Sequence, residues 1–313
     1  MSFRRRDLVA IRASKLPWND RSGRFSLTKA LSLALTLAPA IYLGTLAVKG
    51  MIGGASSALG PRPITEAIHF TGDWAIRFLV ASLAVTPLRR ILNYPKLIQI
   101  RRQLGLASLF YALGHFCLYV ADQKFDLMRV LSEIVLRYYL TIGFVALAGL
   151  VSLGFTSTDA MIRRMGKAWV RLHKGVYLIG VLAALHFFMQ TKADVYQPTL
   201  ISGLFIYLMI WRIAHAQGFN STSLRVLLSL SVLAAALTAI TEYAWYSLAT
   251  NIPADRVLLA NLSFSNSIRP AWWVLSVGLV LAAISKARNG GKRGAAGKSR
   301  CITKSGERYS LAS

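Results

Sequence analysis

Acidic residues are scarce in this chain: Asp and Glu number 12 against 37 Lys and Arg, a formal net charge of +25 over 313 residues. Charged residues make up only 16%, whereas a soluble globular domain carries roughly 25%. Cysteine is rarer still, and the two residues, Cys117 and Cys301, exclude a disulfide framework or a Cys-rich metal site. Hydrophobic residues instead reach 55%, in continuous runs long enough to cross a bilayer. These runs predict an all-α polytopic membrane bundle rather than a soluble domain or a β-barrel.

Eight apolar segments predict eight membrane spans, at about residues 30–48, 74–92, 104–120, 138–154, 169–188, 199–213, 226–247 and 270–285. The basic residues between them alternate: 27 of the 37 Lys and Arg fall on one side, eight on the other, and two within spans. This is the positive-inside pattern, which predicts that both termini are cytoplasmic. The charge is thereby explained by topology, so membrane lipid is an expected partner and nucleic acid is not.

The same pattern predicts four regions along the chain. Residues 1–29 form a basic cytoplasmic N-terminus, and six of the predicted spans lie within residues 30–215. About two additional transmembrane helices occupy residues 216–285, and residues 286–313 form a basic, disordered cytoplasmic tail.

Histidines within the spans are the candidates for chemistry. Ionisable residues in membrane helices are costly and mark functional sites, although a single neutral histidine can also simply bond a neighbouring helix. His115 in the third span and His186 in the fifth are expected at one depth near the outer face, with His173 roughly 20 Å away near the inner face. Two imidazoles at one depth can ligate a haem iron from both sides, and two such levels would carry electrons across a bilayer.

Two features fit this interpretation less well. On an ideal helix the thirteen residues between His173 and His186 place their side chains some 140° apart. The inner level also lacks an obvious second ligand: His215, a non-histidine ligand or a flavin in place of a haem are all open. No Cys, Asp or Glu accompanies the histidines at ligand spacing, so a zinc site is not expected.

Arg77 lies within the second predicted span, where a buried guanidinium needs an anion. It could pair with a haem propionate at the outer level, since the planar guanidinium fork suits a carboxylate. It could equally reach the outer head groups along its aliphatic stem. The chain contains no GxSxG, P-loop or GxGxxG in a βαβ context, so it is not expected to carry its own NAD or FAD domain.

Four stretches resemble the MsrQ (formerly YedZ) family, within the wider group that shares the ferric-reductase-like transmembrane domain. They are DWAIRFLVASLAVTPLRR (Asp73–Arg90), RRQLGLASLFYALGHFCLYV (Arg101–Val120), AWVRLHKGVYLIGVLAALHFF (Ala168–Phe188) and IYLMIWR (Ile206–Arg212). The likeness covers roughly residues 30–215 and is specific as a set, because the arginine pair, the Tyr-Ala-x-x-His and the spaced histidine pair occur in order. The C-terminal third departs from it.

The resemblance implies a six-helix core in a bacterial inner membrane that binds one or two haems b, with His115, His173 and His186 at the family's haem histidines. Such subunits take electrons from a cytoplasmic flavin reductase or the quinone pool. They pass them to a periplasmic molybdenum-containing subunit that reduces methionine sulfoxide in oxidised proteins. FMN and ubiquinone are further cofactors that the resemblance suggests. The chain would then be an electron-transfer subunit rather than the catalytic one.

Two alternatives stay open on sequence alone. Within the redox class, the chain could be a ferric-reductase-like or quinol-linked cytochrome b with another acceptor. Outside it, the chain could be a non-redox polytopic transporter, a class that often shows internal repeats with interrupted helices. The sequence contains no convincing repeat of that kind.

Overall fold

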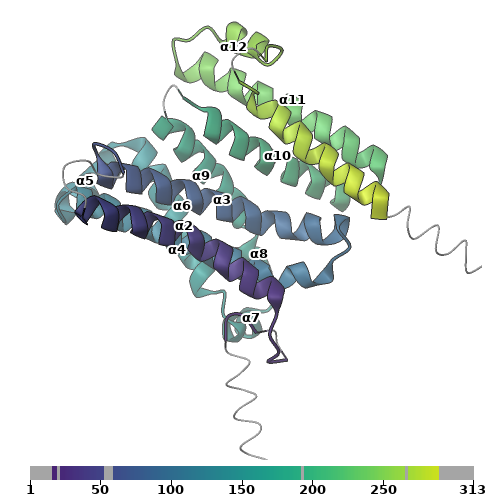
Figure 1. The fold of residues 1–313 in the computed structure, drawn as a ribbon, viewed down its shortest axis with the longest axis horizontal. Coiled ribbons are helices and arrows are strands. Elements are labelled where there is room, and N and C mark those ends of the chain that lie inside the picture. The colour runs from purple at the N-terminus through teal and green to yellow at the C-terminus, as the bar shows by residue number, and fades with distance from the viewer. Residues whose placement is uncertain (1–15, 20–21, 53–58, 192–193, 265–266, 289–313) are drawn as a thin grey trace, which may run out of the picture. The chain divides into compact units, whose positions relative to one another are not determined.

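The computed structural model describes residues 16–19, 22–52, 59–191, 194–264 and 267–288. The predictions for residues 1–15, for most of the basic tail and for Cys301 fall outside these ranges. Figure 1 labels the helices α2 (Leu27–Ile52), α3 (Pro63–Ile91), α4 (Arg101–Asp122), α5 (Leu127–Leu136), α6 (Tyr138–Phe155), α7 (Asp159–Met165), α8 (Lys167–His173), α9 (Val176–Thr191), α10 (Tyr196–Ala216), α11 (Leu224–Ala249) and α12 (Ala254–Ala260). The 3-10 helix η1 (Pro95–Ile100) precedes α4, and a C-terminal helix spans Pro270–Arg288.

The all-α fold class is confirmed. Within the described ranges, eight helical segments are long and apolar enough to cross a membrane, and each overlaps one of the eight predicted spans. The backbone polar groups of such segments are bonded within the helix, which is what a lipid environment requires. The chain is a multi-pass membrane protein.

The second span was predicted to begin at residue 74, which is wrong, because α3 begins at Pro63. Polar residues in its first half lower the local hydropathy, but the helix satisfies them internally. The Thr71 hydroxyl donates to the Ala67 carbonyl at 2.8 Å, and Asp73 pairs with Arg77 one turn later at 3.2 Å. Arg77 consequently lies near the middle of the helix rather than one turn from its outer end.

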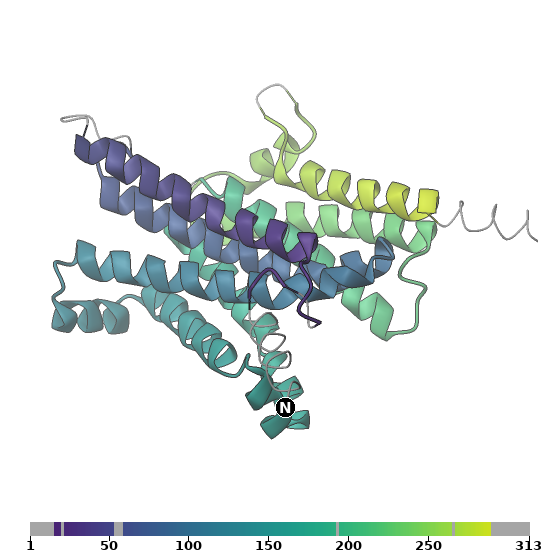
Figure 2. The same ribbon diagram turned by 60° about the horizontal axis from the view of Figure 1, so that its bottom comes forward.

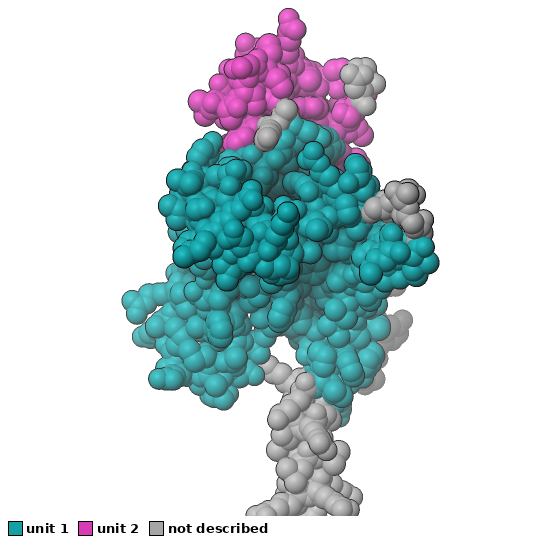
Figure 3. Space-filling model, turned by 90° about the vertical axis from the view of Figure 1, so that its left-hand side faces the viewer, with its two compact units in different colours: residues 1–86, 96–201 teal, residues 87–95, 202–313 magenta. Residues whose placement is uncertain are grey.

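The chain divides into two compact units, coloured separately in Figure 3. The first comprises residues 1–86 and 96–201, and the second residues 87–95 and 202–313. The division predicted near residue 215 stays a prediction.

The first unit is a bundle in which α6 packs along α9 and also contacts α4 and α5. Figures 1 and 2 show α2 running beside α3 and α4; the Tyr111 hydroxyl on α4 donates to the Thr36 carbonyl on α2 at 2.9 Å. Its buried apolar core joins four helices through Leu79, Leu109, Ala146, Leu150, Leu153 and Ile179. A Cβ on Gly149 would lie 2.8 Å from the Ile179 side chain, so α6 and α9 approach closely at this small residue.

The second unit packs α11 against α12 and holds a buried ion pair. Glu242 on α11, only 1% exposed, pairs with Arg269 at the start of the C-terminal helix. Asn261 adds an amide donor to the same carboxylate at 3.4 Å, and its carbonyl accepts from the Trp272 indole at 2.6 Å. Two later residues, Asn261 and Arg269, therefore contact the carboxylate of Glu242, and Trp272 bonds the backbone of one of them.

Candidate functional site

An apolar cavity lies inside the first unit, between α3, α4, α6 and α9, with α5 contributing at one end. His115 on α4 and His186 on α9 both line it. Their imidazole rings lie close together, with centroids 6.2 Å apart and planes nearly perpendicular, at 87°. Each histidine lies near the C-terminal end of its helix, so α4 and α9 bring two residues 71 positions apart in the chain to one place.

Both rings are oriented by backbone carbonyls of neighbouring helices. Nδ1 of His115 lies 2.8 Å from the carbonyl oxygen of Ile68 on α3. Nδ1 of His186 lies 2.8 Å from the carbonyl oxygen of Tyr139 on α6. A carbonyl oxygen only accepts, so Nδ1 carries the proton in each ring and Nε2 keeps its lone pair. This is the tautomer that a metal-ligating histidine needs, held by the kind of outer contact that fixes such ligands.

Glycines make room for the two rings. A Cβ on Gly72, four residues after Ile68, would lie 2.9 Å from Nδ1 of His115. A Cβ on Gly143, four residues after Tyr139, would lie 2.7 Å from Nδ1 of His186. Any side chain at either glycine would push the imidazole away from its carbonyl, so the two sites are built on the same plan.

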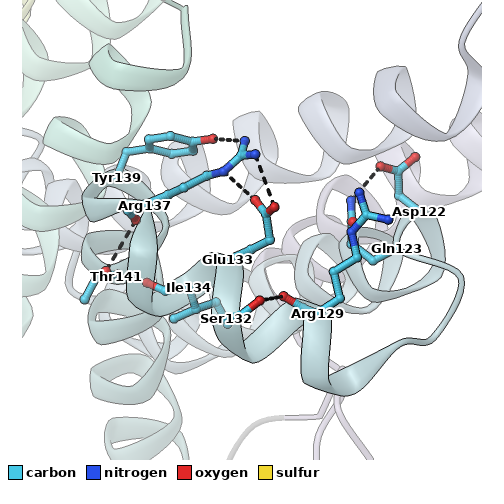
Figure 4. Close-up of polar contacts among 9 residues, drawn as sticks. All are labelled: Asp122, Gln123, Arg129, Ser132, Glu133, Ile134, Arg137, Tyr139 and Thr141. Carbon is cyan, nitrogen blue, oxygen red and sulfur yellow. Dashed lines mark hydrogen bonds and ion pairs between the residues drawn. The ribbon is translucent and has the colours of Figure 1, made fainter.

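The junction between α5 and α6 supports the carbonyl that holds His186 (Figure 4). Arg137 forms an ion pair with Glu133, and its guanidinium donates to the Tyr139 hydroxyl at 3.2 Å. Together with the nearby Glu133, this hydrogen bond raises the pKa of Arg137. The Thr141 hydroxyl also donates to the Ile134 carbonyl of α5 at 2.5 Å. These contacts fix the first turn of α6, which contains Tyr139.

The ring spacing can be compared with that of two ligands on one ion. A metal-bound imidazole nitrogen lies about 2.0–2.1 Å from the ion in zinc sites, so two opposed rings on one ion have centroids roughly 6.4 Å apart. The observed 6.2 Å between His115 and His186 is close to that separation. With both Nε2 lone pairs available and an apolar lining, the residues present fit a haem iron held from two sides.

The other predicted site residues lie elsewhere. His173 on α8 does not line the cavity; its ring stacks on Trp169 with centroids 3.9 Å apart, and its Nδ1 lies 3.1 Å from the Trp169 carbonyl. Arg77 does not line the cavity either, and donates to Asp73 at 3.2 Å and to Gln197 at 3.3 Å. His215, the suggested inner partner, lies in the second unit and contacts Ser221 there.

Several residues of the site were not identified from the sequence. The role of Gly72 and Gly143 becomes visible only from the imidazole rings that pack on them. His69 and Asp73 of α3 line the same cavity, and their place was missed because the span was predicted to start after them. His115 and His186 each follow the carbonyl that holds them by 47 residues, but this offset can be seen only once the contacts are known, so it gave no sequence signal.

A family model described as ferric reductase like transmembrane component matches residues 71–184, a range that contains His115 and His173 and ends just before His186. No solved structure gives a significant match.

The matches to curated relatives extend over most of the length of each relative. The chain is 41% identical over 198 residues to the protein-methionine-sulfoxide reductase heme-binding subunit MsrQ of Xanthomonas euvesicatoria pv. vesicatoria (strain 85-10), covering 63% of this chain and 90% of the relative. It is 39% identical to that of Xanthomonas axonopodis pv. citri (strain 306), with the same coverage. It is 40% identical over 162 residues to that of Brucella ovis, covering 51% of this chain and 73% of the relative. On these matches the chain belongs to the MsrQ family.

Proposed function

We propose that this chain is the haem-binding membrane subunit of a protein-methionine-sulfoxide reductase system, with one haem b held between His115 and His186. The observation that carries the proposal is the close pair of imidazoles, each with Nδ1 bonded to a carbonyl and Nε2 available. A haem bound there would supply one-electron redox chemistry. The chain's own part is to hold the two rings at a fixed separation and to surround them with an apolar lining.

The direction of electron flow belongs to the same proposal. The asymmetric distribution of basic residues supports an inner-membrane topology with both termini cytoplasmic. In that topology the ends of α4 and α9 that carry His115 and His186 would lie toward the periplasm. Electrons would enter from a cytoplasmic flavin reductase or the quinone pool and leave to a periplasmic molybdenum-containing catalytic subunit. A reporter enzyme active only in the periplasm should work when fused after Gln123 and fail when fused after Gly166.

A second haem near the inner face and the binding of FMN and ubiquinone stay predictions. His173 is stacked on Trp169 through its ring face, and its buried Nε2 has no hydrogen-bond partner among the described residues, so a second haem at this ring stays a prediction. Arg77 is already paired with Asp73, so its pairing with a haem propionate also stays a prediction. The core of residues 30–215 is proposed as the electron-transfer part, and residues 216–285 as helices added to it.

A reduced-minus-oxidised visible spectrum of the purified full-length chain, with haem quantified per chain, tests the cofactor. We expect a b-type spectrum that is lost in both His115→Ala and His186→Ala. His173→Ala should keep it if one haem is bound, and should lower the stoichiometry from two to one if a second site exists. A wild-type protein that stays colourless when expressed with ample haem would contradict the proposal.

A second experiment tests the acceptor. The wild-type chain in proteoliposomes, supplied with either a flavin reductase or ubiquinol, should support methionine-sulfoxide reduction by an added molybdenum catalytic subunit of the MsrQ system. The two donors are compared separately. A haem-loaded chain that is reduced by a donor but supports no sulfoxide reduction would leave the cofactor assignment standing and overturn the acceptor.

A further inference from the structure

A second hollow, of about 530 Å³, lies wholly within the second unit. One side is the last turn of α3 and the turn after it, and the other is the end of α10 with its connection to α11. Its lining is Arg89, Arg90, Asn93, Pro95, His215, Phe219, Asn220, Ser221 and Thr222. It shares no residue with the cavity of His115 and His186.

The lining is basic and contains no acid. Arg89 and Arg90 both contribute, and neither forms an ion pair with any residue that the structure describes. Cationic residues at the C-terminal end of a helix are favoured by its dipole, which accounts for two arginines ending α3. That preference does not account for the polar turn of residues 220–222, which completes the same hollow.

Arg90 is positioned by a rigid support. Its guanidinium donates to the ring of His215, whose Nδ1 lies 3.1 Å from the Ser221 hydroxyl. The indole of Trp211 stacks on the same ring with centroids 5.4 Å apart and planes at 15°, and its Nε1 donates to the Ser221 carbonyl at 3.0 Å. Trp211 and Ser221 are only 1% and 4% exposed, so the two residues that orient His215 are themselves buried.

This support orients Arg90 without neutralising it. A histidine ring carries no negative charge, so its contact with Arg90 does not neutralise the guanidinium. The full positive charge of Arg90 therefore stays available to a ligand. Asn220 adds a further donor, because its Oδ1 already accepts from the Thr222 hydroxyl at 2.9 Å and its amide nitrogen is left over.

We propose that this hollow binds a phosphate group. Two guanidinium forks with a neutral amide donor and no competing carboxylate match a tetrahedral anion with several acceptor oxygens. The phosphate can come from a phospholipid head group, since basic pockets between membrane helices take such groups, or from a soluble phosphate ester. The hollow lies between connections on the predicted cytoplasmic side, where both sources are present.

The test uses probe pairs that differ by the phosphate. Purified full-length chain in phosphate-free detergent is titrated with flavin mononucleotide against riboflavin, and with dioctanoyl phosphatidylglycerol against dioctanoylglycerol. At least one phosphate-bearing probe should bind, and its phosphate-free counterpart should bind more weakly. R89A/R90A should weaken that binding about tenfold or more, because charge-assisted hydrogen bonds are lost. R163A/R164A, which removes an exposed arginine pair of α7, is the matched control and should leave it unchanged.

The probe that responds identifies the source. If R89A/R90A loses binding of phosphatidylglycerol alone, the ligand is a lipid head group. If it loses binding of flavin mononucleotide alone, the ligand is a soluble phosphate ester. If the double variant fails to fold, Arg90→Gln keeps a polar side chain without the charge and should still weaken binding. The proposal is overturned if no phosphate-bearing probe binds the wild-type chain, or if R89A/R90A binds as tightly as R163A/R164A. Neither result depends on whether haem is bound.

Discussion

A methyl group added at Gly143 would lie 2.7 Å from both Nδ1 and Cε1 of His186. Favourable contacts between non-bonded carbon atoms occur at about 3.5–4.0 Å, so Gly143→Ala must push the ring off its hydrogen bond to Tyr139. We expect haem per chain to fall severalfold while the protein still folds. Haem content, measured by absorbance against protein concentration, checks this.

Gly114→Ala is the matched control. Gly114 precedes His115 on α4, and nothing lies within 4 Å of a Cβ built there. An alanine inside a helix is favoured over glycine by roughly 0.5–1 kcal/mol, so this variant should be at least as stable as wild type and keep its haem. If both alanine variants lost haem equally, close packing of glycine on the imidazole would not be the cause.

Arg137→Ala is predicted to have little effect on haem content. The Arg137 side chain is 53% exposed in its pair with Glu133, and exposed ion pairs contribute little to stability. The first turn of α6 also keeps the bond from the Thr141 hydroxyl to Ile134. Haem per chain should stay close to wild type, and any loss should be smaller than in Gly143→Ala. A loss as large as in that variant would show that the side chain of Arg137 is required to hold His186.

The sequence predicted the helices well because hydropathy and the alternation of basic loops follow directly from composition. It also paired His115 with His186, since two parallel spans carry them at similar positions. It could not show that His173 stacks on Trp169 or that Arg77 pairs with Asp73. Both contacts join side chains one turn apart on a single helix, so the spacing permits them. Whether these side chains pair with each other or with another helix or a cofactor depends on packing that hydropathy does not report. The glycines beside the rings are likewise visible only once the helices are packed.

Removing the acid of the buried pair in the second unit should destabilise the protein. Glu242→Leu would leave Arg269 without its carboxylate, and breaking a buried ion pair from one side costs about 3–5 kcal/mol. The loss should fall toward the lower end because the Arg269 side chain is 22% exposed. The double variant E242L/R269M removes both charges and should recover most of the stability that Glu242→Leu loses. Thermal unfolding followed by circular dichroism in detergent measures both, and a double variant no better than the single one would contradict the argument.

Valine at Gly278 should disrupt the C-terminal helix while sparing the haem site. A Cβ there would lie 2.6 Å from Cβ of Ser231 on α11, so the two helices pack through small residues as membrane helices commonly do. Gly44→Val is the control, because nothing lies within 4 Å of a Cβ at that position on α2. We expect faster proteolysis after α11 in Gly278→Val alone. The haem spectrum should persist in both variants, because every residue lining the histidine cavity lies in the first unit. Loss of the spectrum in Gly278→Val but not in Gly44→Val would instead show that the added helices are needed to keep the histidines in place.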